Sequence, residues 1–408
     1  MISRKYLFEK DEISLFKCND FEEIKKDIET IFVKNKEILP KNKNAKILIK
    51  PNLNNDLNAL TGNSTDLRII VGVLESLHKR GYKDITLADG PNCGVNHIGI
   101  DVFGRLCLNK IAEIYKVKLK NLNKEHGTEV QLTTGPAKIA AICIDSDFII
   151  NIPKMKTHVE AKMTLSCKNY IGTFIGTQKR QIHNNLPANI VRIAEIIKTD
   201  LIIVDGLIGM EGRGPGDGTP KKVGVILSGH NPFLMDFLVS KLMGLDYKDI
   251  PFLKILIQKG HISKEDIKII EMSERIAKFK PGEKTFFDRI LLNNKFINIR
   301  FSKTFEKFFN KGFVPWVLFK LGVKQDKYVF EEREIKRFYE KENISEKDRE
   351  KIKKCLATYC PIGIKKLGDK KCINCMYCYQ ILPHLIKYEG NLGSFRMQME
   401  RFGKYIKE

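Results

Sequence analysis

The chain has 408 residues, which suffices for two or three domains with a substantial core, and its hydrophobic content of 43% is ordinary for a globular protein. The formal net charge is +22, but much of it comes from isolated lysines, so nucleic acid is not expected as a partner. The sequence shows no signal peptide, no apolar run long enough to span a membrane and no disulfide framework. We therefore expect a cytoplasmic protein without a transmembrane segment.

Short, continuous apolar runs alternate with helical patterns through the first 250 residues. Such runs are typical of strands buried on both faces of a parallel sheet, and the alternation predicts an α/β fold whose largely parallel sheet is flanked by helices. The expected strands are Ile47 to Ile49, Ile85 to Ala88, Phe148 to Ile150, Leu201 to Val204 and Val223 to Leu227. The expected helices are Leu67 to Lys79, Val102 to Tyr115, Ala188 to Lys198 and Pro232 to Met243.

Polar residues follow the expected strands and define one rim of the sheet, where α/β proteins bind ligands. Lysines suit a carboxylate or phosphate, and a histidine can donate or accept a proton near neutral pH. The alternatives are a solvated, lysine-rich loop and histidines held in structural hydrogen bonds. We predict that a small anionic ligand binds to Lys50, Asn52, Lys154, Lys156, Lys168, Asn169, Asp205 and Glu211, with His158 and His183 as catalytic candidates.

The segment from Asp205 to Pro220 is rich in glycine. Its backbone N–H groups could face an anion, but a tight turn without ligand contact is an equally open reading. The lysine and Ser/Thr of a P-loop are absent. Asp205 and Glu211 could instead act as an acid/base pair, whereas no spacing in this segment recommends a metal site.

Basic residues and phenylalanines are concentrated between Arg275 and Phe330. Phe301, Phe305, Phe308 and Phe309 fall on one face of an expected helix. This face would pack on the core, dock a partner protein or make a peripheral membrane contact. The charge alternation from 331 to 354 predicts a solvated helix or linker.

Three cysteines follow at C-x-x-C-x-x-C spacing, Cys372, Cys375 and Cys378, and Cys360-Pro361 precedes them. The bacterial ferredoxin pattern places three cysteines around one cluster and takes the fourth ligand from a distant Cys-Pro. The second half of that pattern is lost, because Leu382 replaces its Cys-Pro cysteine and the corresponding upstream positions are Glu350, Lys353 and Leu356. We predict a single 4Fe-4S cluster held by Cys360, Cys372, Cys375 and Cys378.

Other roles for the cysteines remain open. Zinc also binds thiolates at C-x-x-C spacing, and Cys355 could replace Cys360 as the fourth ligand. Cys167 is expected to be a buried small hydrophobe, whereas Cys93 is the better candidate for an exposed thiol.

Several motifs in order resemble the family called domain of unknown function 362: ILIKPNLN from Ile47, DFIINIPKMKTH from Asp147, TLSCKNYIGT from Thr164, His183 and VDGLIGMEGRGPGDGTP from Val204. The likeness runs from about residue 46 to 246, and the cysteine module extends it to about 388. Members of this family are often labelled iron-sulfur cluster-binding proteins because many carry a C-terminal ferredoxin-like module. The resemblance implies such a module here but names no reaction.

Together these features predict an α/β ligand domain (1–272), a basic aromatic helical connector (273–349), a ferredoxin-like cluster module (350–392) and a basic tail (393–408). The expected function is that of an iron-sulfur oxidoreductase, acting reductively on a small anionic substrate or cofactor and exchanging electrons with one 4Fe-4S cluster. An electron donor or acceptor protein is the expected partner. The alternative is a non-catalytic electron-transfer or cluster-carrying protein.

Overall fold

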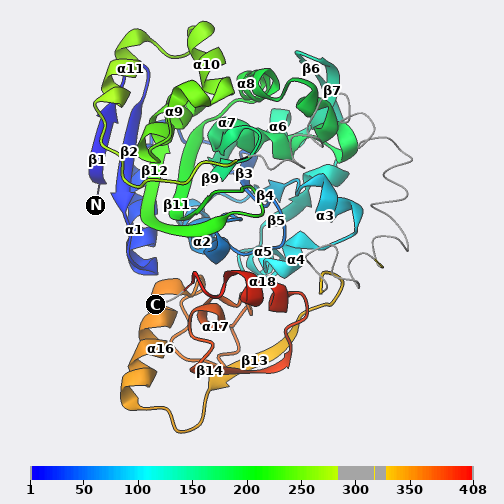
Figure 1. Cartoon of the computed structure of the whole chain (residues 1–408), viewed down its shortest axis with the longest axis vertical. Coiled ribbons are helices and arrows are strands. Elements are labelled where there is room, and N and C mark those ends of the chain that lie inside the picture. Colours follow the sequence, from blue (N-terminus) through cyan, green and yellow to red (C-terminus); the bar gives the residue numbers. More distant parts are fainter. Residues whose placement is uncertain (1, 284–316, 318–327, 407–408) are drawn as a thin grey trace.

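The structure is a computed structural model that describes residues 2–283, 317 and 328–406 (Figure 1). Its main feature is a ten-stranded mixed sheet with the order β1-β2-β12-β11-β8-β3-β4-β5, and β9 and β10 attach beside β11. The central strands pair in parallel, whereas β1, β2 and β12 form an antiparallel edge. The predicted α/β fold with a largely parallel sheet is confirmed.

The parallel centre of the sheet is buried on both faces. Its strands are β3 (Ile47–Pro51), β4 (Ile85–Asp89), β5 (Lys118–Asn121) and β8 (Phe148–Ile152). Alternate side chains of one strand enter different cores: Ile47 and Ile49 pack with helices α1 and α2, whereas Leu48 packs with α8, α9 and α10. Burial on both faces explains why these strands read as continuous apolar runs. The helices are α1 (Phe21–Lys34), α2 (Leu67–Lys79), α8 (Leu186–Ile196), α9 (Pro232–Leu242) and α10 (Pro251–Gln258).

Helix α2 has the bounds that the apolar periodicity predicts. Asp66 caps its first turn, since its side chain accepts a hydrogen bond from the N–H of Arg68. The expected helix from Val102 to Tyr115 is instead two helices, α4 (Val102–Arg105) and α5 (Leu108–Ile114). The break lies at Cys107, whose φ of 62° is left-handed and incompatible with a continuous helix.

The last two strands of the sheet are longer than expected. Strand β11 (Leu201–Glu211) does not end at Asp205-Gly206 but continues beyond them, and it pairs antiparallel with β12 (Thr219–Gly229). Strand β11 can continue past Asp205-Gly206 beside β9 because residue 209 is glycine. A Cβ at this position would lie only 2.9 Å from the carbonyl oxygen of Met155. The glycine-rich segment is therefore a hairpin whose connection includes Gly212 and Gly218.

The remaining strands and helices are mostly short. The strands are β1 (Ile2–Leu7), β2 (Glu12–Lys17), β6 (Gly127–Leu132), β7 (Gly135–Ala140), β9 (Lys154–His158) and β10 (Lys162–Thr164). The α-helices are α3 (Cys93–His97), α6 (Ile142–Asp145), α7 (Ser166–Asn169) and α11 (Lys264–Glu271). The 3₁₀ helices are η1 (Ala59–Thr61), η2 (Leu122–Lys124), η3 (Tyr170–Thr173), η4 (Gly176–Asn185) and η5 (Tyr247–Asp249).

The C-terminal residues form a small unit below the large sheet in Figure 1. A two-stranded antiparallel sheet of β13 (Glu334–Glu340) and β14 (Ile386–Asn391) carries helices α16 (Glu346–Tyr359), α17 (Tyr377–Ile381) and α18 (Phe395–Phe402). The expectation of a helix or linker from 331 to 354 was wrong for 334–340, because pairing with β14 overrides the helical charge pattern. The small sheet thus begins inside the span that the sequence assigns to the connector.

Helix α16 also carries the three positions at which a second cluster would need cysteines. Glu350, Lys353 and Leu356 lie on this regular helix, and Leu382 is fully buried. The apolar residues of the C-terminal unit belong to the same core cluster as α1 and α2, so the unit packs on the α/β body.

The phenylalanine face from Phe301 to Phe309 lies outside the described residues. Docking or membrane contact through this face therefore stays a prediction. Within the described part of the chain, no helix combines the length and apolar character needed to cross a membrane.

Candidate functional site

The lysines expected in a loop after β8 lie instead on strand β9, where Lys154, Lys156 and His158 alternate with Met155 and Thr157. Strand β9 pairs with β10 on one side and with β11 on the other. Lys154 and Lys156 are each 0% exposed. The alternative of a solvated loop is therefore wrong, because both side chains are buried and belong to a paired strand.

Two of the buried lysines form ion pairs at the carboxyl ends of the strands. The Nζ of Lys50 lies 2.5 Å from Oδ1 of Asp89, and the Nζ of Lys154 lies 2.8 Å from Oδ2 of Asp205. Each carboxylate also accepts a backbone hydrogen bond, Asp89 from the N–H of Leu53 at 2.6 Å and Asp205 from the N–H of Asp66 at 2.7 Å. Pairing and backbone donors together offset the cost of burying the charges.

Glycine is required beside the first ion pair. A Cβ on Gly172 would lie 2.3 Å from Oδ1 of Asp89 and 2.8 Å from Nζ of Lys50. The backbone of η3 therefore closes directly over Lys50 and Asp89.

Lys156 makes no hydrogen bond with a carboxylate in the part of the chain that the structure describes. Its Nζ donates to Oδ1 of Asn52 at 2.7 Å and to the carbonyl oxygen of Asn63 at 2.8 Å. Burial, followed by the charges of Lys168 and Lys154, lowers the pKa of Lys156 well below its ordinary value. The neutral amide and carbonyl oxygens therefore do not fully stabilise the charged form of Lys156, and a bound anion would favour that form.

A chain of side-chain amides links the lysines. The Nδ2 of Asn52 donates to Oδ1 of Asn169 at 2.9 Å, and the Nδ2 of Asn169 donates to Oδ1 of Asn151 at 2.7 Å. Asn151 in turn donates to the carbonyl oxygen of Ser166 at 3.1 Å. These contacts fix the orientation of Asn52, and therefore of the oxygen that holds Lys156.

Lys168 and the two histidines lie around the β9–β10 hairpin. The half-buried Lys168 makes no hydrogen bond with any described residue, and burial lowers its pKa to about 8 although the charge of Glu160 opposes the shift. The Nδ1 of His183 lies 3.1 Å from Oε2 of Glu160. The Nδ1 of His158 accepts hydrogen bonds from the N–H groups of Glu160 and Ala161, so a neutral His158 carries its proton on Nε2.

The structure therefore brings most of the sequence-predicted residues together, but it separates Glu211 from them. At the far end of β11, Glu211 accepts from Nζ of Lys221 at 3.1 Å and from the N–H of Lys280 at 3.0 Å. Sequence reasoning also missed Glu160 and Lys179 as members of the group. Lys179 donates to the carbonyl oxygens of Gly90 and Pro91, and burial lowers its pKa to about 8. No spacing in the sequence signals either residue, because Glu160 reaches the site from the hairpin turn and Lys179 from the 3₁₀ helix η4.

The four cysteines of the C-terminal motif line one cavity. Its other lining residues are apolar or aromatic: Phe338, Leu356, Ile362, Ile364, Ile373, Met376 and Tyr377. Burial raises the pKa of the thiols of Cys360, Cys372, Cys375 and Cys378. At Cys360 the backbone N–H groups of 362, 363 and 364 oppose that rise, since they donate toward the sulfur. Such N–H donors stabilise a thiolate.

The loop between these cysteines is wound by two residues in left-handed conformation, Asn374 with φ 58° and Met376 with φ 71°. The Nδ2 of Asn374 donates to the carbonyl oxygen of Ile335 on β13 at 2.6 Å, which anchors the loop on the small sheet. Cys355 is buried on α16 but does not line the cavity. Among the described residues, no group of three or more His, Cys, Asp or Glu is placed to hold a single metal ion.

The other two cysteines singled out in the sequence lie apart from this motif. Cys167 is fully buried, as expected, and burial together with the charge of Asp236 raises its thiol pKa well above the ordinary value. Cys93 is half-buried, and its sulfur lies 3.8 Å from the carbonyl oxygen of Gly176.

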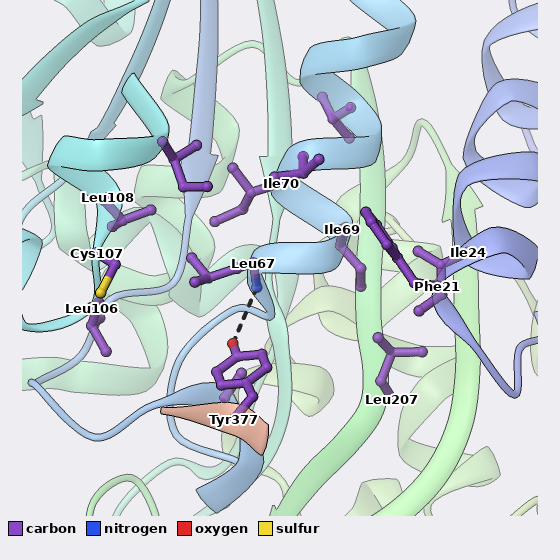
Figure 2. Packing of buried hydrophobic residues seen from close by; sticks show 14 of the residues in the cluster. Phe21, Ile24, Leu67, Ile69, Ile70, Leu106, Cys107, Leu108, Leu207 and Tyr377 are labelled. Atoms are coloured by element: carbon purple, nitrogen blue, oxygen red, sulfur yellow. Dashed lines mark hydrogen bonds between the residues drawn. The ribbon is translucent and has the colours of Figure 1, made fainter. Parts of the chain in front are cut away.

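The cysteine loop and the lysine site meet at the start of helix α2. The hydroxyl of Tyr377 accepts a hydrogen bond from the N–H of Leu67 at 3.3 Å (Figure 2). Leu67 follows Asp66, whose N–H binds Asp205, the partner of Lys154. A continuous series of bonded residues therefore joins the cavity lining to the buried lysines.

Further contacts fix this junction. The guanidinium of Arg68 forms an ion pair with Asp66 at 2.7 Å and also donates to the carbonyl oxygen of Thr358 on α16 at 2.9 Å. Nearby, Nδ2 of Asn58 donates to Oε1 of Gln380 on α17 at 2.8 Å. The two parts of the chain therefore meet through buried polar contacts as well as through apolar packing.

Comparison with known proteins bears on the α/β body. Residues 47–241 match the model of the family described as "Domain of unknown function (DUF362)". The likeness to this family therefore lies in the α/β body. It is also 28% identical over 219 residues to the thylakoid-associated protein sll1697 of Synechocystis sp., and the match spans 50% of this chain and 65% of that relative.

Two solved structures are also similar to the chain. One is a protein from Thermotoga maritima, with 15% identity, a TM-score of 0.32, and coverage of 50% of this chain and 55% of that one. The other is the lactate racemase apoprotein from Thermoanaerobacterium thermosaccharolyticum, with 10% identity, a TM-score of 0.36, and coverage of 55% and 58%.

Proposed function

We propose that this protein is an iron-sulfur oxidoreductase that reduces a small anionic substrate or cofactor at the strand-end lysines. In this proposal Cys360, Cys372, Cys375 and Cys378 hold one 4Fe-4S cluster. The observation that carries it is the lining of one cavity by all four cysteines, directly beside Tyr377 and the start of α2.

The residues present fit such a cluster. Four thiols distributed around a cavity suit the corners of a cluster, whereas a single zinc ion draws its ligands to one point. The remaining lining is apolar or aromatic, and backbone N–H groups point toward the sulfur of Cys360. A bound cluster would supply single electrons, and burial and N–H donors are the means by which a protein tunes its potential.

The charge balance of the lysine site supports an anionic ligand. Lys50 and Lys154 are neutralised by Asp89 and Asp205, but among the described residues Lys156 hydrogen-bonds only to neutral oxygens. In our proposal Lys50, Lys154 and Asn52 fix the geometry of the site, and the surplus positive charge attracts the anion. His183 with Glu160 would move a proton at the rim.

The proposal also requires an electron donor or acceptor protein, since no described part of the chain supplies a second redox centre. The name of the Synechocystis relative associates that protein with thylakoids. Peripheral membrane contact of this chain is accordingly part of the proposal. Sedimentation with anionic lipid vesicles would test it, and protein remaining in the supernatant at low ionic strength would contradict it.

The decisive experiment is anaerobic purification of wild type and of the double variant Cys372→Ser, Cys375→Ser. We expect about four iron and four sulfide per wild-type chain and an EPR signal after reduction, all lost in the double variant. The variant Cys143→Ser is the control, because Cys143 is buried outside the cysteine motif and should leave iron and signal unchanged. One zinc per chain without sulfide, or iron retained by the double variant, would overturn the cluster assignment.

A further inference from the structure

The β9–β10 hairpin contains a buried hydroxyl with no hydrogen-bond partner. Thr164 is 3% exposed, and its Oγ1 has none among the described residues. Thr164 lies directly opposite Lys156 in the antiparallel pair, so both side chains leave the same face of the hairpin. A buried hydroxyl without a partner costs free energy, and its retention beside a lysine requires a reason.

Lys168 approaches the same place from the next element. It lies on α7, which begins two residues after β10 ends at Thr164. Its ammonium makes no hydrogen bond with a described residue, and its charge acts on Lys156. Lys156 and Thr164 thus share one face of the hairpin, Lys168 follows on the next helix, and none of the three is bound to a carboxylate of the described residues.

We propose that Lys168, Lys156 and the Thr164 hydroxyl form the subsite that binds the oxyanion group of the ligand, a carboxylate or a phosphate. The inference rests on the proposed function in that it places the charged end of the same anionic substrate. The Nζ of Lys156 is already held by Asn52 and Asn63, so a bound anion would act on Lys156 mainly by favouring its charged form. Lys168 and Thr164 supply the hydrogen-bond donors for the anion, because neither side chain hydrogen-bonds to another described residue.

Proton uptake would distinguish Lys168 as a ligand from Lys168 as a structural residue. The charged groups that act on it are Glu160 in the hairpin turn and Lys156 on β9, and its pKa is about 8. Above pH 8 a growing fraction of Lys168 is neutral, and a bound anion favours the charged form. Anion binding at pH 8.5 should therefore draw a proton into the protein.

The test is isothermal titration calorimetry of the full-length protein with sodium acetate and with inorganic phosphate, at constant ionic strength. Repeating the titration at pH 8.5 in buffers of different ionisation enthalpy measures the protons taken up. Binding of acetate alone identifies a carboxylate subsite, and binding of phosphate alone identifies a phosphate subsite. Binding of neither anion would overturn the inference.

The variant Lys168→Met should weaken binding at least about tenfold and reduce proton uptake below that of the wild type. The control is Lys162→Met, because Lys162 lies on the same hairpin but, among the described residues, its Nζ hydrogen-bonds only to the carbonyl oxygen of Gly282, at 3.4 Å. Wild-type affinity and proton uptake in Lys168→Met would contradict the assignment.

Thr164→Val supplies a second test that does not depend on charge. Because the hydroxyl has no partner in the folded protein, its replacement by a methyl group should leave the melting temperature unchanged or raise it. Anion affinity should nevertheless fall several-fold. A less stable variant with wild-type affinity would show that the hydroxyl serves the fold instead.

The subsite can also be separated from the redox proposal. The Cys372→Ser, Cys375→Ser variant should bind the anion with wild-type affinity, provided that circular dichroism shows it folded. Anion binding without iron in the wild-type protein would refute the oxidoreductase and leave the subsite standing. Wild-type protein that contains iron but binds neither anion would refute the subsite and leave the cluster assignment standing.

Discussion

The hydroxyl of Tyr377 lies 3.3 Å from the backbone nitrogen of Leu67, and this hydrogen bond connects the cysteine loop to the first residue of helix α2 (Figure 2). Tyr377 stands between Cys375 and Cys378, and Leu67 follows Asp66, which binds Asp205. The contact therefore places the two candidate sites within a few residues of each other, although they are 310 residues apart in sequence.

Tyr377→Phe removes only this hydroxyl. We expect a loss of about 1 kcal/mol in the free energy of unfolding, because the N–H of Leu67 is left without its acceptor. Iron content should remain at the wild-type level, since the cysteines are untouched. Urea unfolding and iron analysis measure both quantities.

Tyr379→Phe serves as the control for that variant. Tyr379 packs against Phe338 and Tyr388 in the same module. Equal destabilisation by both substitutions would show that the hydrogen bond to Leu67 contributes nothing specific.

The ion pair between Lys50 and Asp89 gives the second prediction. Lys50→Met leaves Asp89 buried without its cation and should cost about 3–5 kcal/mol of stability. Asp89→Asn in the same chain should recover part of the loss, because the neutral amide oxygen can still accept from the N–H of Leu53. A double-mutant cycle by chemical denaturation measures the coupling, and additive losses would contradict the pairing.

Asp236 gives a pH-dependent prediction. This residue of α9 accepts hydrogen bonds from the N–H groups of Ser166 and Cys167, yet burial raises its pKa to about 7. The folded chain therefore binds more protons at this group than the unfolded chain between about pH 4 and 7. The free energy of unfolding contributed by Asp236 should fall as pH rises through that window.

Asp236→Asn removes this titration. The difference in unfolding free energy between wild type and variant, measured at pH 5 and at pH 8, should change in favour of the variant at the higher pH. A difference that is the same at both pH values would mean that Asp236 is ionised throughout. The measurement requires only that both proteins unfold reversibly.

Much of the α/β core could be predicted because its residues obey local rules. The apolar stretch of β3 and the periodicity and cap of α2 each specify one structure without help from distant residues. The convergence of Lys50, Lys154, Lys156 and Asn169 could also be anticipated, since carboxyl ends of parallel strands share one edge.

Other features depend on distant partners and could not be derived from local pattern. The segment KMKTH of β9 is too polar to read as a buried strand, and only pairing with β10 and β11 makes it one. Strand β13 depends in the same way on β14, about fifty residues later. The partner carboxylates Asp89 and Asp205 were visible, but which lysine each would neutralise is a matter of three-dimensional packing.

Helix α16 limits the number of electrons that the proposed cluster module could hold at one time. Its regular backbone occupies the stretch where a second set of cysteines would have to wind, so the proposed module stores one electron at a time. Any two-electron reduction would then need two separate encounters with the donor protein. Between those encounters a half-reduced intermediate would have to be shielded from water and oxygen, and the burial of Lys50, Lys154 and Lys156 would limit the access of water on that side of the site.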